Sequence, residues 1–362
     1  MLKKAYLEIS NVCNLSCRFC PGTKREARIM TPAEFHVLAE RLRKHTDYLY
    51  LHVMGEPLLH PQLEELLGIA AELGFRVIIT TNGTLLPERG ALLLKSEAVH
   101  KVNISLQSFE GNGGDEPEDY LRACADFAAA AGESGKLCVL RLWNSGGFET
   151  LNPRIRAELA RRFPQSWEEF RRSLRLAPRV FLESGDMFDW PDMTAAELGE
   201  SCFCYGLRDQ VGVLCDGTVV PCCLDHDGDV PLGNLFEREL DEILASPRAV
   251  SIREGFSRRR AVEELPPLRL RKEILTMIDY ELIRSDRRSL SLAVRDGRPL
   301  VRAPRRLAKR EIDRFVAAHE DWIKAQLERA RPIQAEISPR RKSACGMRRG
   351  SICPAGSSIT AA

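Results

Sequence analysis

The strongest constraint on the fold is the alternation of short apolar runs with longer amphipathic segments over the first half of the chain. The apolar runs are rich in Val, Ile and Leu, which is typical of buried strands. The amphipathic segments are typical of helices that cover a sheet. The alternation therefore predicts a parallel sheet with helices on its outside, in the α/β class. The predicted strands cover residues 5–9, 48–53, 75–80, 101–106, 137–142 and 179–182, and the predicted helices cover 32–44, 61–73, 87–96, 118–131 and 152–163.

A partial (β/α)6 TIM-like barrel fits this pattern better than an open sheet, because polar motifs follow successive strands. In barrels the chemistry lies at the carboxyl ends of the strands. Composition changes further along the chain predict a small cysteine-rich hairpin region and a separate α+β fragment at the C-terminal end. The predicted parts are a core barrel (1–183), a cysteine-rich region (184–265), a linker or fusion seam (266–276), a basic hairpin-plus-helix fragment (277–330) and a disordered tail (331–362).

Three of the twelve cysteines, Cys13, Cys17 and Cys20, follow the first predicted strand at C-x3-C-x2-C spacing. Three thiolates cannot complete a four-coordinate structural zinc site without a distant ligand. On a 4Fe–4S cluster they would leave one iron open, as a catalytic centre requires. The spacing, with the aromatic Phe19 before the last cysteine, resembles the radical S-adenosylmethionine (SAM) enzymes. The resemblance implies that the three cysteines hold the cluster, whose fourth iron binds SAM.

The same resemblance implies SAM-binding positions after the later strands. The second strand runs into a Gly-Glu-Pro stretch that in this family contacts the amino group of SAM, with Met54 where the family has a first glycine. The fourth strand alternates apolar and polar residues, which predicts that Asn103, Ser105 and Gln107 share one face. The implied SAM neighbours are Phe19, Gly55, Glu56, Pro57, Asn82, Ser105 and Gln107. No catalytic residue can be named.

A second group of cysteines surrounds an Asp-Gly hairpin signal at 216–217. Cys204, Gly217 and Cys222 resemble the start of a SPASM or twitch domain, which implies an auxiliary 4Fe–4S cluster. Those domains need further cysteines, and none occurs between Cys223 and Cys345. The sequence leaves two alternatives, an auxiliary cluster completed by neighbouring cysteines or a cysteine-rich hairpin without metal.

The C-terminal third differs in charge from the rest. Residues 1–268 carry 31 Lys and Arg against 40 Asp and Glu, whereas residues 269–349 carry 22 against 11. Residues 277–330 resemble the N-terminal part of a family of small zinc metallohydrolases, but the H-E-x-x-H motif of that family is absent. No hydrolase activity is therefore implied. The interpretations are a truncated fusion or a solvated basic surface, and a nucleic-acid partner is disfavoured because the arginines are scattered among acids.

The sequence thus predicts an enzyme that reductively cleaves SAM to generate a 5′-deoxyadenosyl radical. Its substrate is unknown, with a peptide as the weak analogy, and its electron donor would be a flavodoxin or a ferredoxin. No apolar run reaches the length of a membrane helix, and the start of the chain has no apolar signal region, so we expect a cytoplasmic protein. The alternatives are a non-catalytic zinc or iron–sulfur scaffold with a basic C-terminal region, and a hybrid reading frame that folds only in part.

Overall fold

The computed structural model describes the chain in two units, residues 1–270 and 271–362. In the first unit it describes residues 1–114, 117–147, 149–171, 173–187, 190 and 204–259. In the second it describes 280–287, 289–295, 298–305, 307, 312, 315, 316, 319, 322, 323, 326, 327 and 358–361.

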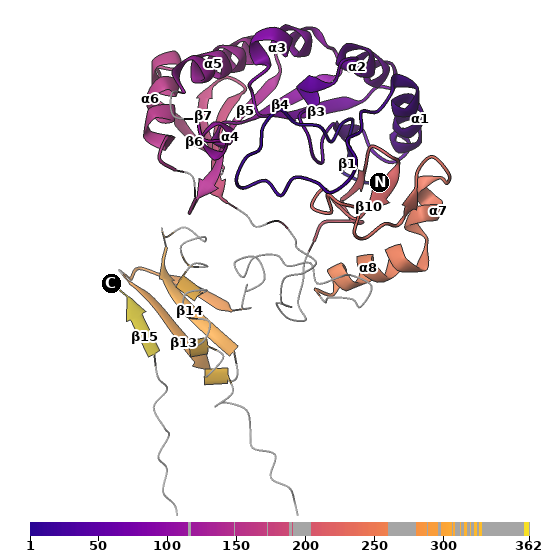
Figure 1. The fold of residues 1–362 in the computed structure, drawn as a ribbon. Coiled ribbons are helices and arrows are strands. Elements are labelled where there is room, and N and C mark those ends of the chain that lie inside the picture. The colour runs from indigo at the N-terminus through magenta and orange to yellow at the C-terminus, as the bar shows by residue number, and fades with distance from the viewer. Residues whose placement is uncertain are drawn as a thin grey trace, which may run out of the picture. The chain divides into compact units, whose positions relative to one another are not determined.

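The first unit is built on one curved sheet of eleven strands (Figure 1). Seven neighbouring strands, β9-β1-β2-β3-β4-β5-β8, are parallel, and antiparallel strands extend the sheet at both edges. The strands in chain order are β1 Lys4–Leu7, β2 Tyr48–Tyr50, β3 Arg76–Thr81, β4 Val99–Ser105, β5 Leu137–Ser145, β6 Glu168–Phe170, β7 Ser173–Ala177, β8 Val180–Asp186, β9 Gln210–Val213, β10 Thr218–Val220 and β11 Gly233–Asn234.

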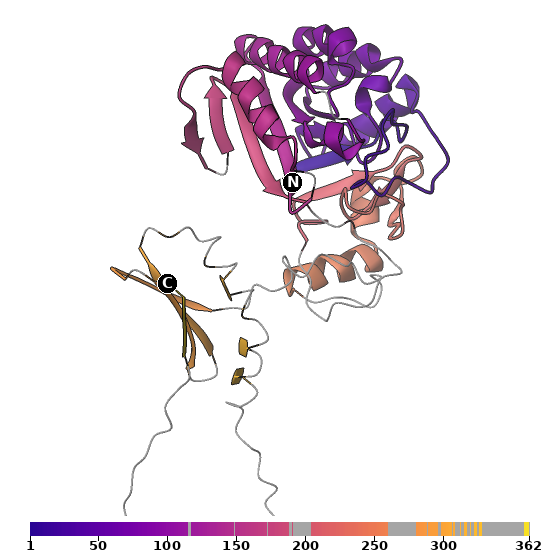
Figure 2. The ribbon, with the colours of Figure 1, turned by 60° about the vertical axis from the view of Figure 1, so that its left-hand side comes forward.

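Helices cover the convex side of this sheet, and the main core lies between the two layers (Figure 1; Figure 2). The first helix begins with a capping box, in which Thr31 accepts a hydrogen bond from the Glu34 backbone N–H and Glu34 accepts one from the Thr31 backbone N–H. Leucines on its inner face, such as Leu38 and Leu42, are fully buried. The helices are α1 Pro32–Arg43, the 3-10 helix η1 Pro57–Leu59, α2 Leu63–Glu72, α3 Leu86–Lys95, α4 Gln107–Gly111, α5 Glu118–Glu133, α6 Asn152–Arg162, α7 Leu240–Leu244 and α8 Pro247–Ser257.

The predicted α/β architecture is confirmed, and the six predicted strands correspond to β1 to β5 and β8. The sequence did not predict the hairpin of β6 and β7, whose short strands carry little apolar periodicity. The sequence also predicted the cysteine-rich region (184–265) as a part separate from the barrel. β9 pairs in parallel with β1, from Lys4 opposite Gln210 to Leu7 opposite Val213, so this region continues the barrel sheet.

The second unit contains a four-stranded sheet in the order β12-β14-β13-β15. Its strands are β12 Glu281–Ser285, β13 Leu290–Arg295, β14 Arg298–Pro304 and β15 Ser358–Ala361. A small core of Leu292, Val301, Ile312, Val316 and Ile323 joins the sheet to described helical residues, which are Ile312, Val316 and Ile323. The disordered tail predicted for 331–362 stays a prediction, and within that range Ser358–Ala361 pairs with β13 as the strand β15. The predicted linker at 266–276 and the tail cysteines Cys345 and Cys353 lie outside the described residues.

Candidate metal centre and cofactor site

The loop between β1 and α1 carries the three motif cysteines, and its two ends are held together. Ser10 and Ile29 form an antiparallel bridge, and the Met30 N–H donates to the Ile9 carbonyl over 2.9 Å. The Asn11 amide donates to the Glu26 carbonyl and accepts from the Arg28 N–H, at 2.8 and 2.7 Å. These contacts between the two ends of the loop fix the points at which the cysteine segment leaves β1 and enters α1.

Cys13, Cys17 and Cys20 lie on this loop at the carboxyl end of β1. The Cys13 sulfur accepts from the Leu15 N–H at 3.5 Å, and the Cys17 sulfur lies 3.5 Å from the Ser108 carbonyl oxygen. Burial and then the Cys20 and Cys13 thiols raise the pKa of Cys17 to about 12, so the three sulfurs lie near one another. A bound cation would reverse this effect and favour the thiolates.

The spacing of the sulfurs bears on what they could hold. A single zinc ion would bring its sulfur ligands to within about 4 Å of each other, given zinc–sulfur bonds of about 2.3 Å. Over the described parts of the chain, no three His, Cys, Asp or Glu side chains converge closely enough to hold one metal ion. The described side chains therefore do not form a closed three-ligand site for a single ion.

The predicted Gly-Glu-Pro turn contacts the cysteine loop directly. Gly55 has a φ of +76°, and a Cβ at this position would overlap the Ser10 carbonyl oxygen. The next residue donates its N–H to the Val12 carbonyl at 2.8 Å. Only glycine permits this close approach, which places the turn against the residue that precedes Cys13.

Glu56 and Asn82 connect the loop to the end of β3. The buried Glu56 carboxylate accepts from the backbone N–H of Asn82 at 2.7 Å and of Leu58 at 3.1 Å. The Asn82 amide donates to Asn14 at 2.9 Å and lies 3.9 Å from the Cys13 sulfur. Asn82 is thus beside the cysteine loop, whereas the Glu56 carboxylate is occupied by backbone donors and positions the turn.

The end of β4 differs from its prediction. The strand ends at Ser105, and Leu106 has helical backbone angles, so Gln107 opens α4 and does not share a strand face with Ser105. Its side-chain oxygen is buried and has no hydrogen-bond partner in the described structure. The Phe19 ring packs against Gly111 of this helix, where a Cβ would overlap the ring. α4 therefore brings Gln107 and Phe19 to the same side of the loop.

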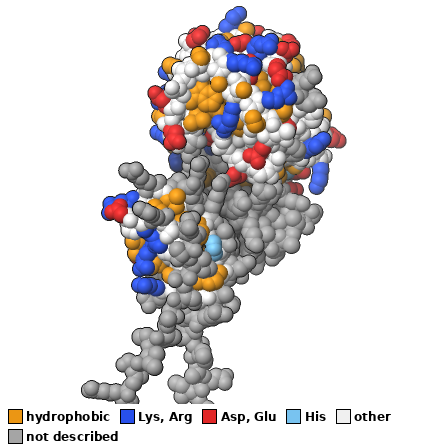
Figure 3. Space-filling view, turned by 90° about the vertical axis from the view of Figure 1, so that its left-hand side faces the viewer, with side chains coloured by type: hydrophobic (Ala, Val, Ile, Leu, Met, Phe, Trp, Pro, Cys, Tyr) orange, Lys and Arg blue, Asp and Glu red, His pale blue; other side chains and the backbone are white. Residues whose placement is uncertain are grey.

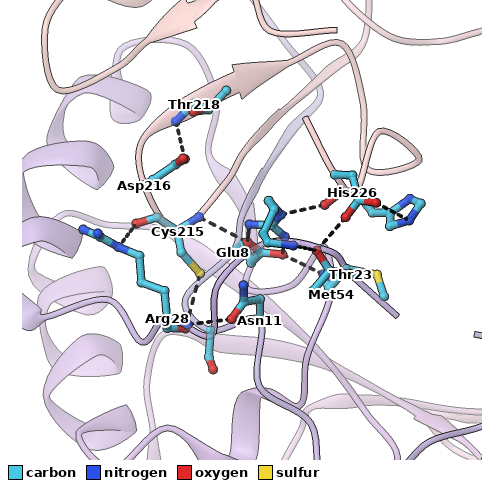
Figure 4. Close-up of polar contacts among 12 residues, drawn as sticks. Glu8, Asn11, Thr23, Arg28, Met54, Cys215, Asp216, Thr218 and His226 are labelled. Atoms are coloured by element: carbon cyan, nitrogen blue, oxygen red, sulfur yellow. Dashed lines mark hydrogen bonds and ion pairs between the residues drawn. The ribbon is translucent and has the colours of Figure 1, made fainter. Parts of the chain in front are cut away.

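One buried carboxylate ties the loop to two other segments (Figure 4). Both oxygens of Glu8 accept from the Arg25 guanidinium at 2.7 Å. The same oxygens accept from the Met54 N–H at 3.0 Å and from the Cys215 N–H at 3.1 Å. Glu8 therefore joins the cysteine loop, the residue before the Gly-Glu-Pro turn, and the β9–β10 hairpin.

Comparison with protein families agrees with this geometry. Residues 7–144, which run from β1 into β5, match the family model of the radical SAM superfamily. Residues 7–144 are similar to the radical SAM superfamily. The predicted resemblance is therefore confirmed, and the cysteine loop, the turn and Asn82 all lie inside the matched residues.

Curated relatives match this chain over about a hundred residues. They include an AdoMet-dependent heme synthase of Oleidesulfovibrio alaskensis (26% identical over 102 residues), an Fe-coproporphyrin III synthase of Methanosarcina barkeri (32% over 97) and an S-adenosyl-L-methionine-dependent 2-deoxy-scyllo-inosamine dehydrogenase of Niallia circulans (31% over 107). The matches cover 27%, 26% and 27% of this chain and 26%, 24% and 42% of those proteins. The chain thus matches less than half the length of these relatives.

Solved structures share the fold. Streptococcus suis SuiB aligns with a TM-score of 0.50 at 18% identity, covering 70% of this chain and 68% of that one. Native anSMEcpe with bound AdoMet aligns with a TM-score of 0.50 at 15% identity, covering 72% and 84%. At these identities the likeness establishes only that the radical SAM domain and the strands after it have this architecture.

Residues 202–265 match the SPASM model, described as an iron–sulfur cluster-binding domain. The predicted hairpin is present, and a Cβ at Gly217 would overlap the Phe236 ring. The sulfurs of Cys204 and Cys222 lie 3.6 Å apart. The Cys215 sulfur lies 3.8 Å from the Arg28 carbonyl oxygen, and Cys223 faces Tyr6. Among the described residues, Cys204 and Cys222 are thus a close sulfur pair in this segment.

Residues 288–347 match the YgjP-like metallopeptidase domain, which agrees with the resemblance seen in the sequence. His319 is the one histidine in this segment, and its Nδ1 lies 2.7 Å from the Phe315 carbonyl oxygen. With the H-E-x-x-H motif absent, the segment has the family's likeness without its metal ligands.

Two further observations concern partners. Among the helices that the structure describes, none has the length and apolar character needed to cross a membrane. On the face of the molecule drawn in Figure 3, Lys and Arg side chains are interspersed with Asp and Glu over the first unit. Over the first unit on that face, the described charges are thus mixed, whereas a nucleic-acid backbone binds a continuous positive patch.

Sequence reasoning missed the residues that support the loop. Glu8, Asn11 and Arg25 were assigned no role, although each is a polar residue in or beside the cysteine motif. A charged residue directly after a buried strand is a signal, because a buried charge needs a partner. The partner segments lie up to 207 positions away in the chain, so the sequence could not name them.

Proposed function

We propose that the chain is a radical SAM enzyme in which Cys13, Cys17 and Cys20 hold a 4Fe–4S cluster with one iron open to SAM. The observation that carries the proposal is the contact of the cysteine loop with the Gly55 turn and with Asn82, inside the segment that matches the superfamily. When bound, the cluster would supply the electron that cleaves SAM into methionine and a 5′-deoxyadenosyl radical.

The protein's own residues would position SAM and shield it. The carboxyl ends of β2, β3 and β4, together with the cysteine loop, carry the seven proposed SAM neighbours, which are Gly55, Glu56, Pro57, Asn82, Ser105, Gln107 and Phe19. The unpaired Gln107 oxygen is an acceptor that a bound ligand would satisfy. Glu56 would act through the backbone, because its carboxylate already holds the Asn82 and Leu58 N–H groups.

The test is SAM cleavage by protein reconstituted with iron and sulfide under anaerobic conditions. We expect about four irons at this site, brown absorbance, and 5′-deoxyadenosine formation with dithionite. Cys17→Ala should lose most of the iron and the SAM cleavage. Cys138→Ala is the matched control, because Cys138 is buried in β5 and away from the loop. SAM cleavage by Cys17→Ala, or zinc without iron in the purified protein, would contradict the proposal.

The finer features of the function remain predictions. They are a peptide substrate, a flavodoxin or ferredoxin donor, oxidoreductase chemistry and a cytoplasmic location. An auxiliary cluster at Cys204 and Cys222 is also a prediction. The iron content of the reconstituted protein tests it, because about four irons per chain are expected without the auxiliary cluster and about eight with it. Measuring SAM cleavage with and without cell extract is the direct search for the substrate.

A further inference from the structure

The two faces of the barrel sheet differ sharply in chemistry. On the convex face, residues such as Leu7, Leu49, Ile79, Val102 and Leu140 are fully buried beneath the helices. Alternate residues point to the opposite, concave face. There the register aligns Tyr6, Tyr50, Ile78 and Lys101 across β1 to β4, and Ser105, Arg141 and Glu183 across β4, β5 and β8.

This concave face has more described positive groups than negative ones. Lys4, Lys101 and Arg141 lie on it, and Arg141 lies 3.6 Å from the Glu183 carboxylate and over the Trp143 ring. Lys4 donates to the Tyr6 hydroxyl at 2.9 Å and lies over the Tyr6 and Tyr50 rings. The Lys101 ammonium is only partly exposed, and the described chain offers it no hydrogen-bond or ion-pair partner.

The environment of Lys101 disfavours its charge. Burial, and then Arg141, lower the pKa of Lys101, while Glu183 opposes them. Lys4 is similar, because burial lowers its pKa first, Arg141 adds to this, and Cys223, Cys222 and Asp209 oppose it. An anion placed between these groups would relieve the repulsion and pair with Lys101.

Two neutral side chains on the same face each have one buried polar atom without a hydrogen-bond partner among the described residues. Asn103, two residues after Lys101 on β4, is fully buried, and its side-chain oxygen accepts no hydrogen bond from the described residues. The buried Nδ1 of His52 is likewise unsatisfied. Burial, and then Arg141 and Lys4, lower the pKa of His52 to about 3, so this ring is neutral and adds no charge. Unpaired buried polar atoms are costly unless a ligand satisfies them.

We propose that Lys101, which shares the concave face of the barrel with Lys4 and Arg141, binds an anionic group of the substrate there. The group is a carboxylate or a phosphate. The Asn103 oxygen would accept a hydrogen bond from a substrate hydroxyl or N–H that lies about 7 Å from this anionic group, because alternate residues of a strand are about 7 Å apart. The inference rests on the proposed function, because it assigns a substrate class to the same barrel.

The experiment measures anion binding by the cluster-loaded full chain, with inorganic phosphate and succinate as separate probes. Ligand-induced shifts in the thermal midpoint report the affinity, with and without saturating SAM. At least one probe should bind wild type, and binding should persist with SAM. Lys101→Met should weaken it roughly tenfold or more, as expected for a lost charge-assisted hydrogen bond. Lys101→Arg should keep it.

Lys95→Met is the matched control, because Lys95 is an exposed lysine at the end of α3. It should show the same shift as wild type, which separates site binding from the general effect of phosphate on stability. The inference is overturned if neither probe binds, if Lys101→Met binds as wild type does, or if SAM abolishes binding. The last result would assign the site to SAM itself. Failure of wild type to cleave SAM would instead sink the proposed function.

Discussion

Glu8 follows β1 with its side chain fully buried, and its two oxygens accept four hydrogen bonds from three segments. Two of these come from the Arg25 guanidinium, which is itself 16% exposed. A carboxylate at this position can satisfy all four donors, whereas an amide of the same shape cannot. The residue therefore positions the cysteine loop without belonging to the cysteine motif.

We predict that Glu8→Gln lowers the free energy of unfolding by about 3 kcal/mol, because it leaves the Arg25 charge buried without a counterion. Urea unfolding of the protein measures this. Glu40→Gln, at an exposed position on α1, is the control and should change little. Equal midpoints for the two variants would show that the Glu8 pair contributes nothing.

The glycine of the turn gives a second prediction at this scale. Gly55→Ala combines a φ of +76° with overlap on the Ser10 carbonyl, so we expect a loss of more than about 2 kcal/mol and poorer iron retention. Gly68→Ala, in α2 with open space around it, should instead gain about 0.5–1 kcal/mol. Thermal unfolding of both variants checks the pair. The same sign of change in both would be incompatible with a turn docked on the loop.

At the scale of elements, local sequence signals determined most of the helices and strands. The Thr31 cap and the Pro32 start of α1 were predicted from the sequence and are present. The Asp-Gly turn between β9 and β10 was also predicted and is confirmed. The end of β4 was wrong, because the alternation of polar residues continues past Ser105 although the backbone turns into α4. Periodicity alone does not distinguish a strand from the first turn of a helix.

The α1 capping box makes a prediction about pH. Burial alone would raise the pKa of Glu34, but the Thr31 N–H, the Thr31 hydroxyl and Arg28 together lower it below 4.5. A lowered folded-state pKa means that the box stabilises the protein above about pH 4.5 and loses this contribution as the pH falls through the folded-state pKa. Thr31→Ala should cost about 1 kcal/mol at pH 7.

We expect this difference to be smaller at pH 3 than at pH 7, because protonation of Glu34 at low pH removes its carboxylate from the box. Urea midpoints of wild type and Thr31→Ala at the two pH values measure it. A difference that grows at low pH would rule out the role of the Glu34 carboxylate in the box.

At the scale of the whole molecule, each unit has hydrophobic core residues of its own. Among the described residues, the core of the second unit contains Leu292, Val301 and Ile312. The sequence predicted a seam at 266–276, and the chain divides after Leu270. The radical SAM and SPASM matches lie in the first unit, and the YgjP-like match lies in the second.

We therefore predict that a chain ending at residue 270 folds and binds iron as the full chain does. Its thermal midpoint should lie within a few degrees of the full chain's first-unit transition, because residues 1–270 form a compact unit by themselves. Iron content and circular dichroism measure the comparison. Aggregation of the shortened chain, or loss of its iron, would show that the second unit is needed.

The sequence by itself determined the α/β alternation, the cysteine motif, the Gly-Glu-Pro turn and the family. These depend on local spacing, since strand period, turn chemistry and metal-ligand intervals are written in neighbouring residues. Only the tertiary structure decided that Glu8 meets Arg25, Met54 and Cys215, and that Lys101 and Asn103 share the concave face with Arg141. Those contacts join positions far apart in the chain, and strand order and register, which set them, follow from packing of the whole sheet.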